Sequence, residues 1–169
     1  MEGLTEDDGQ WAPQINLGVP VLIPEGYVPD LDVRLGLYRR LRGLTKKVEL
    51  EGFAAELIDR FGKLPRQVQE LFAGLRLRWV SKRLGFERII LKNRKLRCYF
   101  INNPQSPFFE TALFQRLLQY VANQGPKVGL SFKNSHKHFL LIRENVRDLR
   151  SAKKVLEELE GAAKGAAAI

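Results

Sequence analysis

The feature of the sequence that most constrains the fold is a change of hydrophobic period after Gly85. Before this residue apolar side chains recur every three or four positions, most clearly over residues 50–61. After it, residues 86–91 and 96–101 are rich in β-forming side chains, and the polar stretch 92–95 separates them. A period that changes from 3.6 to 2 predicts an α+β fold in which a helical half precedes a hairpin.

The first half of the chain, residues 15–85, is predicted to be mainly helical. Prolines and glycines punctuate residues 15–29, so this part is expected to be an extended segment lying on the body of the domain. Asp30 then has the position of a helix cap, and glycines and Pro65 mark the later helix boundaries. The expected helices cover residues 31–43, 50–61 and 65–84.

The second half is predicted to have the order β-β-α-β-β-α. The first hairpin is followed by a helix over residues 109–123, which Gly125 and Pro126 are expected to end. A second antiparallel hairpin is expected over residues 128–142. A last helix then carries apolar residues at helical spacing from position 146 to position 159. Two antiparallel hairpins and two helices are therefore expected after the helical half.

Both ends of the chain are expected to lie outside the folded domain. Residues 1–14 mix Gly, Asp, Glu and Gln, which predicts a poorly ordered acidic leader. Residues 161–169 are rich in Gly and Ala and are expected to form a flexible tail. One domain over residues 15–160 remains, with a helical part over residues 15–85 and a lobe of hairpins and helices over residues 86–160.

The composition is that of a soluble globular domain with an excess of positive charge. Of the 169 residues, 44% are hydrophobic and 28% are charged, and the net charge is +9. No uncharged apolar run reaches the roughly 20 residues of a membrane span. The acidic N-terminus does not resemble a secretory signal. A cytoplasmic protein without membrane contact is therefore expected.

The positive charge is concentrated in residues 76–97, which carry nine bases against one acid. Such a stretch can bind phosphates or an acidic protein surface, and a solvated basic face is the alternative interpretation. Tyr99 and Phe100 follow it as candidate stacking groups, although strand alternation would bury one of the two rings. The candidate contacts are Arg78, Lys82, Arg83, Lys92, Arg94, Lys95 and Arg97.

Motifs of catalysis and of phosphate binding are missing from the sequence. It contains no Walker loop, dinucleotide-binding glycine motif, nucleophile elbow or zincin helix. His136 and His138 are expected on one face at a strand end, but two imidazoles without a carboxylate or thiolate do not make a usual zinc site. Cys98, the single cysteine, is expected to be a small buried hydrophobe. No catalytic residue, cofactor or metal is expected in this chain.

Four charged residues lie on the exposed face of the second predicted helix: Glu56, Asp59, Arg60 and Lys63. Glu56 with Arg60, and Asp59 with Lys63, have the i, i+4 spacing of favourable ion pairs. Cations beside both carboxylates would hold them ionised, which makes them unsuited to act as an acid. The pattern does not choose between a solvated face and a contact with a partner.

Three stretches of the sequence resemble a known family. Residues 17–30 read LGVPVLIPEGYVPD, residues 34–40 read RLGLYRR, and residues 56–65 read ELIDRFGKLP. In this order and spacing they closely resemble the C-terminal domain of the bacterial transcription-repair coupling factor (TRCF) family. The resemblance is strong over residues 15–85 and weaker over residues 86–160.

Membership of that family implies a parent protein with three further parts. These are a damage-repair module similar to the excision-repair helicase, a segment that binds RNA polymerase, and an ATP-driven translocase on double-stranded DNA. None of them is present in this chain. ATP and magnesium are thus implied only for the absent motor domains.

The resemblance also implies a regulatory role in transcription-coupled repair. In the family this domain packs against the N-terminal repair module and hides the surface that recruits the damage-recognition ATPase of nucleotide excision repair. The implied contacts of this autoinhibitory interface are Glu56, Asp59 and Arg60, with Lys63 beside them. The alternative function is a basic nucleic-acid-binding module that uses residues 76–100.

Overall fold

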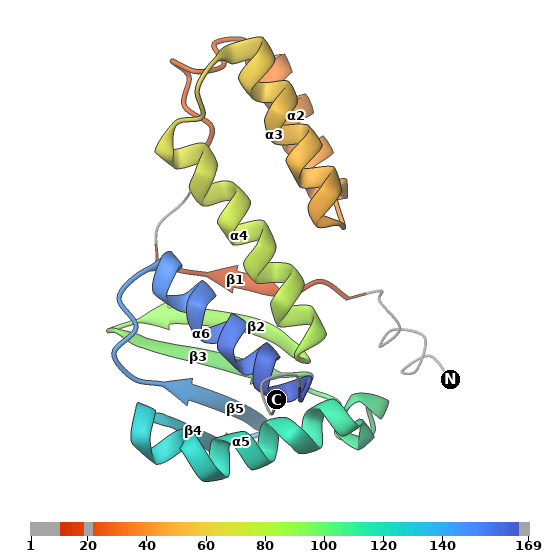
Figure 1. The fold of residues 1–169 in the computed structure, drawn as a ribbon, viewed down its shortest axis with the longest axis vertical. Coiled ribbons are helices and arrows are strands. Elements are labelled where there is room, and N and C mark those ends of the chain that lie inside the picture. Colours follow the sequence, from red (N-terminus) through yellow and green to blue (C-terminus); the bar gives the residue numbers. More distant parts are fainter. Residues whose placement is uncertain (1–10, 19–21, 166–169) are drawn as a thin grey trace. The chain divides into compact units, whose positions relative to one another are not determined.

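The computed structural model describes residues 11–18 and 22–165 of the chain. It divides into a helical unit, residues 20–76, and a sheet unit, residues 1–19 with 77–169 (Figure 1). The mixed α and β composition that the change of period predicts is confirmed. Among the described residues, no helix is long and apolar enough to cross a membrane.

The boundary between the two units falls inside helix α4 (Arg66–Arg83). The sequence places this boundary at Gly85, at the end of the helix. The difference has a simple cause, because Leu77, Val80 and Leu84 are buried in the core of the sheet unit. The last part of α4 therefore packs in the core of the sheet unit, although its apolar residues have helical spacing.

The helical unit contains α2 (Leu31–Gly43), α3 (Lys47–Phe61) and the first part of α4. The expected cap of α2 is confirmed, since the Asp30 side chain accepts a hydrogen bond of 3.0 Å from the N–H of Val33. Between the helices lies a core in which the rings of Phe53 and Phe72 meet edge-on. The buried residues of this unit are Ile23, Val28, Leu37, Leu41, Leu50, Phe53, Leu57, Val68, Phe72 and Leu75.

Helix α3 begins three residues before its apolar stripe. The Glu49 carboxylate accepts hydrogen bonds from the N–H groups of Thr45 (2.9 Å) and Lys46 (3.1 Å), which caps this earlier start. The helix ends at Phe61, as expected, because Gly62 has a φ of 93°.

The segment before α2 is attached to the helices through two tyrosines. The Tyr38 hydroxyl accepts a bond of 2.6 Å from the N–H of Ile23. The Tyr27 hydroxyl lies 2.7 Å from the carbonyl oxygen of Gly62 and 3.2 Å from that of Leu57. These contacts fix the turn at residues 25–28 against α3.

The sheet unit has five strands in the order β1-β2-β3-β5-β4. Strand β1 runs parallel to β2, and the other neighbours are antiparallel. The β2–β3 turn consists of Asn93 and Arg94, both with positive φ, as two-residue hairpins require. The bounds are β1 (Gln14–Asn16), β2 (Phe86–Lys92), β3 (Lys95–Phe100), β4 (Leu130–Ser135) and β5 (His138–Arg143).

One face of the sheet carries the core of this unit. Helices α5 (Ala112–Val128) and α6 (Leu149–Ala163) lie on this side, together with the short helix η2 (Pro107–Glu110). The ring of Phe100 is at the centre, within about 6 Å of several other aromatic rings, among them Phe86, Phe109, Phe114 and Phe139. Alternation along β3 then turns Lys95, Arg97 and Tyr99 to the opposite face.

Several expected boundaries are wrong in the sheet unit: α5 begins at Ala112 and not at residue 109, and α6 begins at Leu149 and not at residue 146. The acidic leader is expected to extend to residue 14, but Gln14 is the first residue of strand β1. Residues 1–10 lie outside the part of the chain that the structure describes. Helix α5 continues through Pro126 to Val128 and ends at Gly129, whose φ of 74° and N–H bond to the carbonyl oxygen of Gly125 form the cap. Helix α6 extends to Ala163, into the expected tail, since Ala163 is buried in the core.

A glycine-to-alanine pair tests this architecture. Gly85 has a φ of 77°, and a Cβ there would overlap the ring of Phe108, so Gly85→Ala should lower the free energy of unfolding by about 1–3 kcal/mol. Gly74→Ala in α4 is the matched control, because its Cβ would meet nothing within 4 Å, and it should raise stability by about 0.5–1 kcal/mol. Urea unfolding measures both, and equal effects would contradict the packing described for Gly85.

Candidate interaction sites

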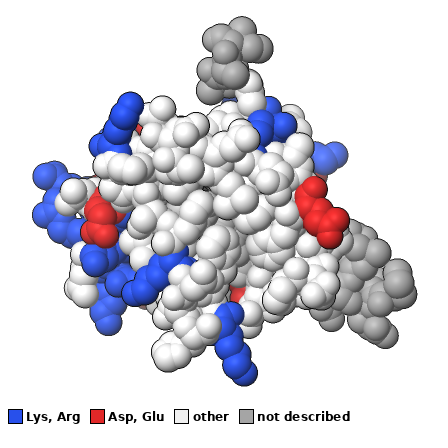
Figure 2. All heavy atoms as spheres, turned by 90° about the horizontal axis from the view of Figure 1, so that it is seen from below, with Lys and Arg blue, Asp and Glu red and all other residues white. Residues whose placement is uncertain are grey.

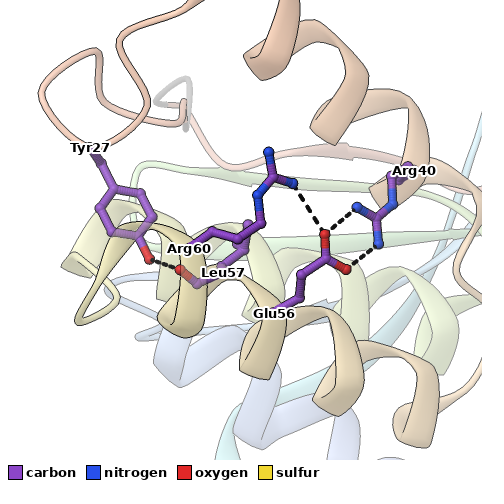
Figure 3. A network of polar contacts seen from close by, with 5 residues as sticks. All are labelled: Tyr27, Arg40, Glu56, Leu57 and Arg60. Carbon is purple, nitrogen blue, oxygen red and sulfur yellow. Dashed lines mark hydrogen bonds and ion pairs between the residues drawn. The ribbon is translucent and has the colours of Figure 1, made fainter.

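Two of the predicted interface residues, Glu56 and Arg60, form an ion-pair cluster with Arg40 between α2 and α3 (Figure 3). The Glu56 carboxylate accepts two hydrogen bonds of 2.7 Å from the Arg40 guanidinium, one at each oxygen. Arg60, one turn further along α3, lies 3.2 Å from the same carboxylate. The expected Glu56–Arg60 pair is present, and Arg40 makes it a cluster of three.

The two guanidinium groups keep the Glu56 carboxyl ionised. Hydrogen bonding to Arg40 is the largest cause, and Arg60 adds to it, so that the pKa of Glu56 falls from 4.5 to about 2 although partial burial opposes the change. The same contact raises the pKa of Arg40. Glu56 is therefore an anion at neutral pH and not a proton donor, as its surroundings in the sequence predict.

Sequence reasoning missed Arg40. It lies within the stretch 34–40, but its partner is sixteen residues away, and only the pairing of α2 with α3 brings the two side chains together. Cation–π contacts also hold the guanidinium groups, since the Cζ of Arg40 lies 5.0 Å from the ring centre of Phe53 and that of Arg60 lies 4.8 Å from the ring centre of Phe61. The cluster is preorganised at the surface of the helical unit.

Asp59 and Lys63 do not form the expected ion pair. Helix α3 ends before Gly62, so Lys63 no longer follows the helical spacing that would bring it to Asp59. Both side chains are exposed, and within the described part of the chain neither has an ion-pair partner. They are the two uncompensated charges beside the cluster.

The basic stretch of the sequence does not form one surface. Arg83 makes two hydrogen bonds to Glu160 of α6, the second of 3.1 Å, and Lys164 lies 3.7 Å from the same carboxylate. Hydrogen bonding to Arg83 is the first cause that lowers the pKa of Glu160, and it raises the pKa of Arg83. Arg83 is therefore part of a structural ion pair within the sheet unit.

The other candidate bases have different surroundings. Arg78 has a buried Nε without a hydrogen-bond partner in the described part, and Lys82 lies 5.5 Å from the ring centre of Trp11. Lys95 is 3.9 Å from Glu144, and Arg94 forms the β2–β3 turn. Seen from below, Lys and Arg gather at the left, the side of that turn in Figure 1, whereas the centre is uncharged (Figure 2).

The remaining candidate side chains, Cys98, His136 and His138, have structural positions in the sheet unit. Cys98 is buried in the core and burial raises the pKa of its thiol. The expectation that His136 and His138 share a strand face is wrong, because His136 lies in the β4–β5 turn with a φ of 55°. The described residues contain no group of three or more His, Cys, Asp or Glu that could hold a metal.

Comparison with known proteins supports the resemblance seen in the sequence. The crystal structure of the C-terminal domain of a transcription-repair coupling factor covers 89% of this chain and 94% of its own, with a TM-score of 0.66 and 21% identity. The chain therefore has the fold of such a domain.

Sequence relatives lead to the same family. The transcription-repair-coupling factor of Escherichia coli (strain K12) is 32% identical over 114 residues, which are 67% of this chain and 10% of that protein. That of Rickettsia conorii is 42% identical over 77 residues, 46% of this chain and 7% of that protein. A family model of the TRCF domain matches residues 17–111. The chain belongs to the TRCF domain family, and its aligned part spans a tenth or less of these relatives.

The charge state of Glu56 can be measured directly. Because its folded pKa is depressed, the Arg40–Glu56 contact stabilises the fold above about pH 4.5 and is lost as the pH falls toward 2. An NMR titration should give a midpoint near 2 for Glu56, and Arg40→Met should move it upward. Arg66→Met, which removes the partner of Glu70 instead, should leave it unchanged. A Glu56 midpoint near 4.5 in the unaltered chain would rule out the cluster.

The Arg83–Glu160 pair should contribute to the stability of the sheet unit. Glu160→Ala removes a nearly buried carboxylate, but the Arg83 side chain is 49% exposed and can be solvated, so we expect the free energy of unfolding to fall by about 1 kcal/mol. Glu157→Ala on the same helix removes an exposed pair with Lys153 and should change stability by less than about 0.5 kcal/mol. Urea unfolding of both variants separates a structural pair from a solvated one.

Proposed function

We propose that this chain is a regulatory interaction domain without catalytic activity of its own, within a transcription-repair coupling factor. In the proposal it packs on the N-terminal repair module of the parent and keeps the damage-recognition ATPase from binding. RNA polymerase, double-stranded DNA, ATP and magnesium are partners and cofactors of the parent's other parts. The observation that supports this role is the exposed, ionised cluster of Arg40, Glu56 and Arg60 within the segment that matches the family.

The cluster has the properties of a specific polar contact. Its charges alternate in sign, and ring contacts and hydrogen bonds hold them in place. A complementary surface would meet fixed groups and lose little side-chain freedom on binding. Asp59 and Lys63 supply unpaired charges at the same end of α3, where the partner could pair with them.

The alternative, a nucleic-acid module over residues 76–100, has weaker support. Arg83 is already paired with Glu160, and the ring of Phe100 lies in the core. Of the nine bases in residues 76–97, only Arg88, Lys92, Lys95 and Arg97 share one face of the sheet. The regulatory proposal is therefore the one we retain.

Charge reversal at Arg60 tests the proposal in the full-length parent. Arg60→Glu would place like charges across the contact and release the repair module, so affinity for the damage-recognition ATPase should rise by about tenfold or more. Isothermal titration calorimetry measures this affinity.

Arg66→Glu is the matched control, because Arg66 is also exposed in the helical unit and also pairs with a glutamate one turn away. It should leave the affinity unchanged. If an Arg60→Glu parent that is folded binds the ATPase as the unaltered parent does, Glu56, Asp59 and Arg60 do not belong to the interface.

A further inference from the structure

The sheet has a second face that the core does not use. Directly paired residues of neighbouring strands share a face, so the strand register defines two rows of side chains across all five strands. We call these two rows the open sheet face. The first row is Gln14, Arg88, Tyr99, Leu140 and Lys133, and the second is Asn16, Ile90, Arg97, Ile142 and Ser131.

The burial pattern agrees with this assignment. Leu140 is only 2% exposed and does not belong to the core cluster, whereas its neighbour Leu141 does, so other residues cover this face at Leu140. Ile90, Arg97, Tyr99 and Ile142 are half-buried, as expected for side chains that cover each other on a sheet surface.

The charge on the open sheet face has one sign. Arg88, Arg97 and Lys133 lie in the two rows, and Lys92 opposite Lys95 continues the face toward the β2–β3 turn. No Asp or Glu occurs among the ten residues of the two rows. Glu87 precedes Arg88 in the chain and accepts a hydrogen bond from the N–H of Asn102, and Glu144, which follows the end of β5, lies 3.9 Å from Lys95. The face is thus complementary to an anionic partner.

Arg97 has a special position at the centre of this face. Its neighbours in register are Ile90 on β2 and Ile142 on β5, both aliphatic. Within the described residues its guanidinium has neither a hydrogen bond nor an ion pair, unlike those of Arg40, Arg60 and Arg83. A half-buried arginine whose register neighbours are two isoleucines offers a fork of donors that matches a carboxylate.

The surroundings of Tyr99 argue against a nucleic acid on this face. The Arg88 guanidinium lies 4.2 Å from the centre of the tyrosine ring, and His138 contacts the ring edge-on at 5.8 Å. Leu140 lies opposite Tyr99 in register on the other side. A base would have to displace these groups before it could stack, so the stacking contribution to single-strand affinity is missing.

We propose that the open sheet face binds an acidic polypeptide segment of a partner protein. One carboxylate of the segment pairs with Arg97, further carboxylates meet Arg88 and Lys133, and aliphatic side chains of the segment lie on Ile90 and Ile142. Aliphatic residues between cations favour such a ligand over a polyanion without apolar groups. This surface belongs to the sheet unit and is separate from the proposed contact at Glu56 in the helical unit, so the two proposals can fail independently.

The test uses the complete 169-residue chain and a fluorescent peptide that alternates glutamate with leucine. Anisotropy should show saturable binding, and Arg97→Gln should weaken it by about tenfold, because a charge-assisted pair is lost. Lys127→Gln is the matched control: it removes the same charge from an exposed position on α5, and it should have little effect.

A second variant tests the apolar part of the surface. Ile142→Thr keeps the β-branched shape and should weaken the glutamate–leucine peptide while leaving a glutamate–serine peptide unchanged. Circular dichroism and urea unfolding establish that each variant is folded.

Three results would overturn the proposal. The first is no binding of the glutamate–leucine peptide, and the second is an equal loss in Arg97→Gln and Lys127→Gln, which would indicate net charge alone. The third is tighter, Arg97-dependent binding of single-stranded or duplex oligonucleotides, which would make the face a nucleic-acid surface.

Discussion

Helix α4 has to contribute to two hydrophobic cores along one continuous chain. Val68, Phe72 and Leu75 are buried with the helical unit, and Leu77, Val80 and Leu84 are buried with the sheet. This explains why the helix lacks one dominant apolar stripe and why its last residues pack against strands. The aromatic core at Phe100 and the pairing of Arg83 with Glu160 both depend on where this helix ends.

Local signals in the sequence were sufficient for much of the fold. Asp30 caps α2, Gly62 ends α3, and the period change near Gly85 gives the mixed α and β class, because each of these effects acts over a few residues. The parallel pairing of β1 with β2 could not be predicted, since Ile15 and Ile89 are far apart in the chain. The end of α5 was also missed, because Gly125 and Pro126 give an earlier stop signal than Gly129, the residue that caps the helix.

The candidate sites show the same limit. The sequence indicates Glu56 and Arg60 as an exposed pair, but Arg40 enters only through the packing of two helices. In the basic stretch, a count of charges could not separate Arg83, which is paired in the fold, from Arg97, which is not. The chemistry of a charged side chain on a strand depends on its neighbours on the adjacent strands. These neighbours follow from the register of the whole sheet, and its second hairpin begins about thirty residues further along the chain.

The single cysteine has a practical consequence. Cys98 is only 1% exposed and lies in the middle of β3, so a thiol reagent can reach it only when the sheet opens. Because Cys98 is the single cysteine of the chain and lies in the sheet unit, the rate of labelling reports the opening of the sheet unit alone. The chain thus carries its own probe for the opening of the sheet unit, and comparing it with a signal from the helical unit tells whether the two units unfold together or in succession.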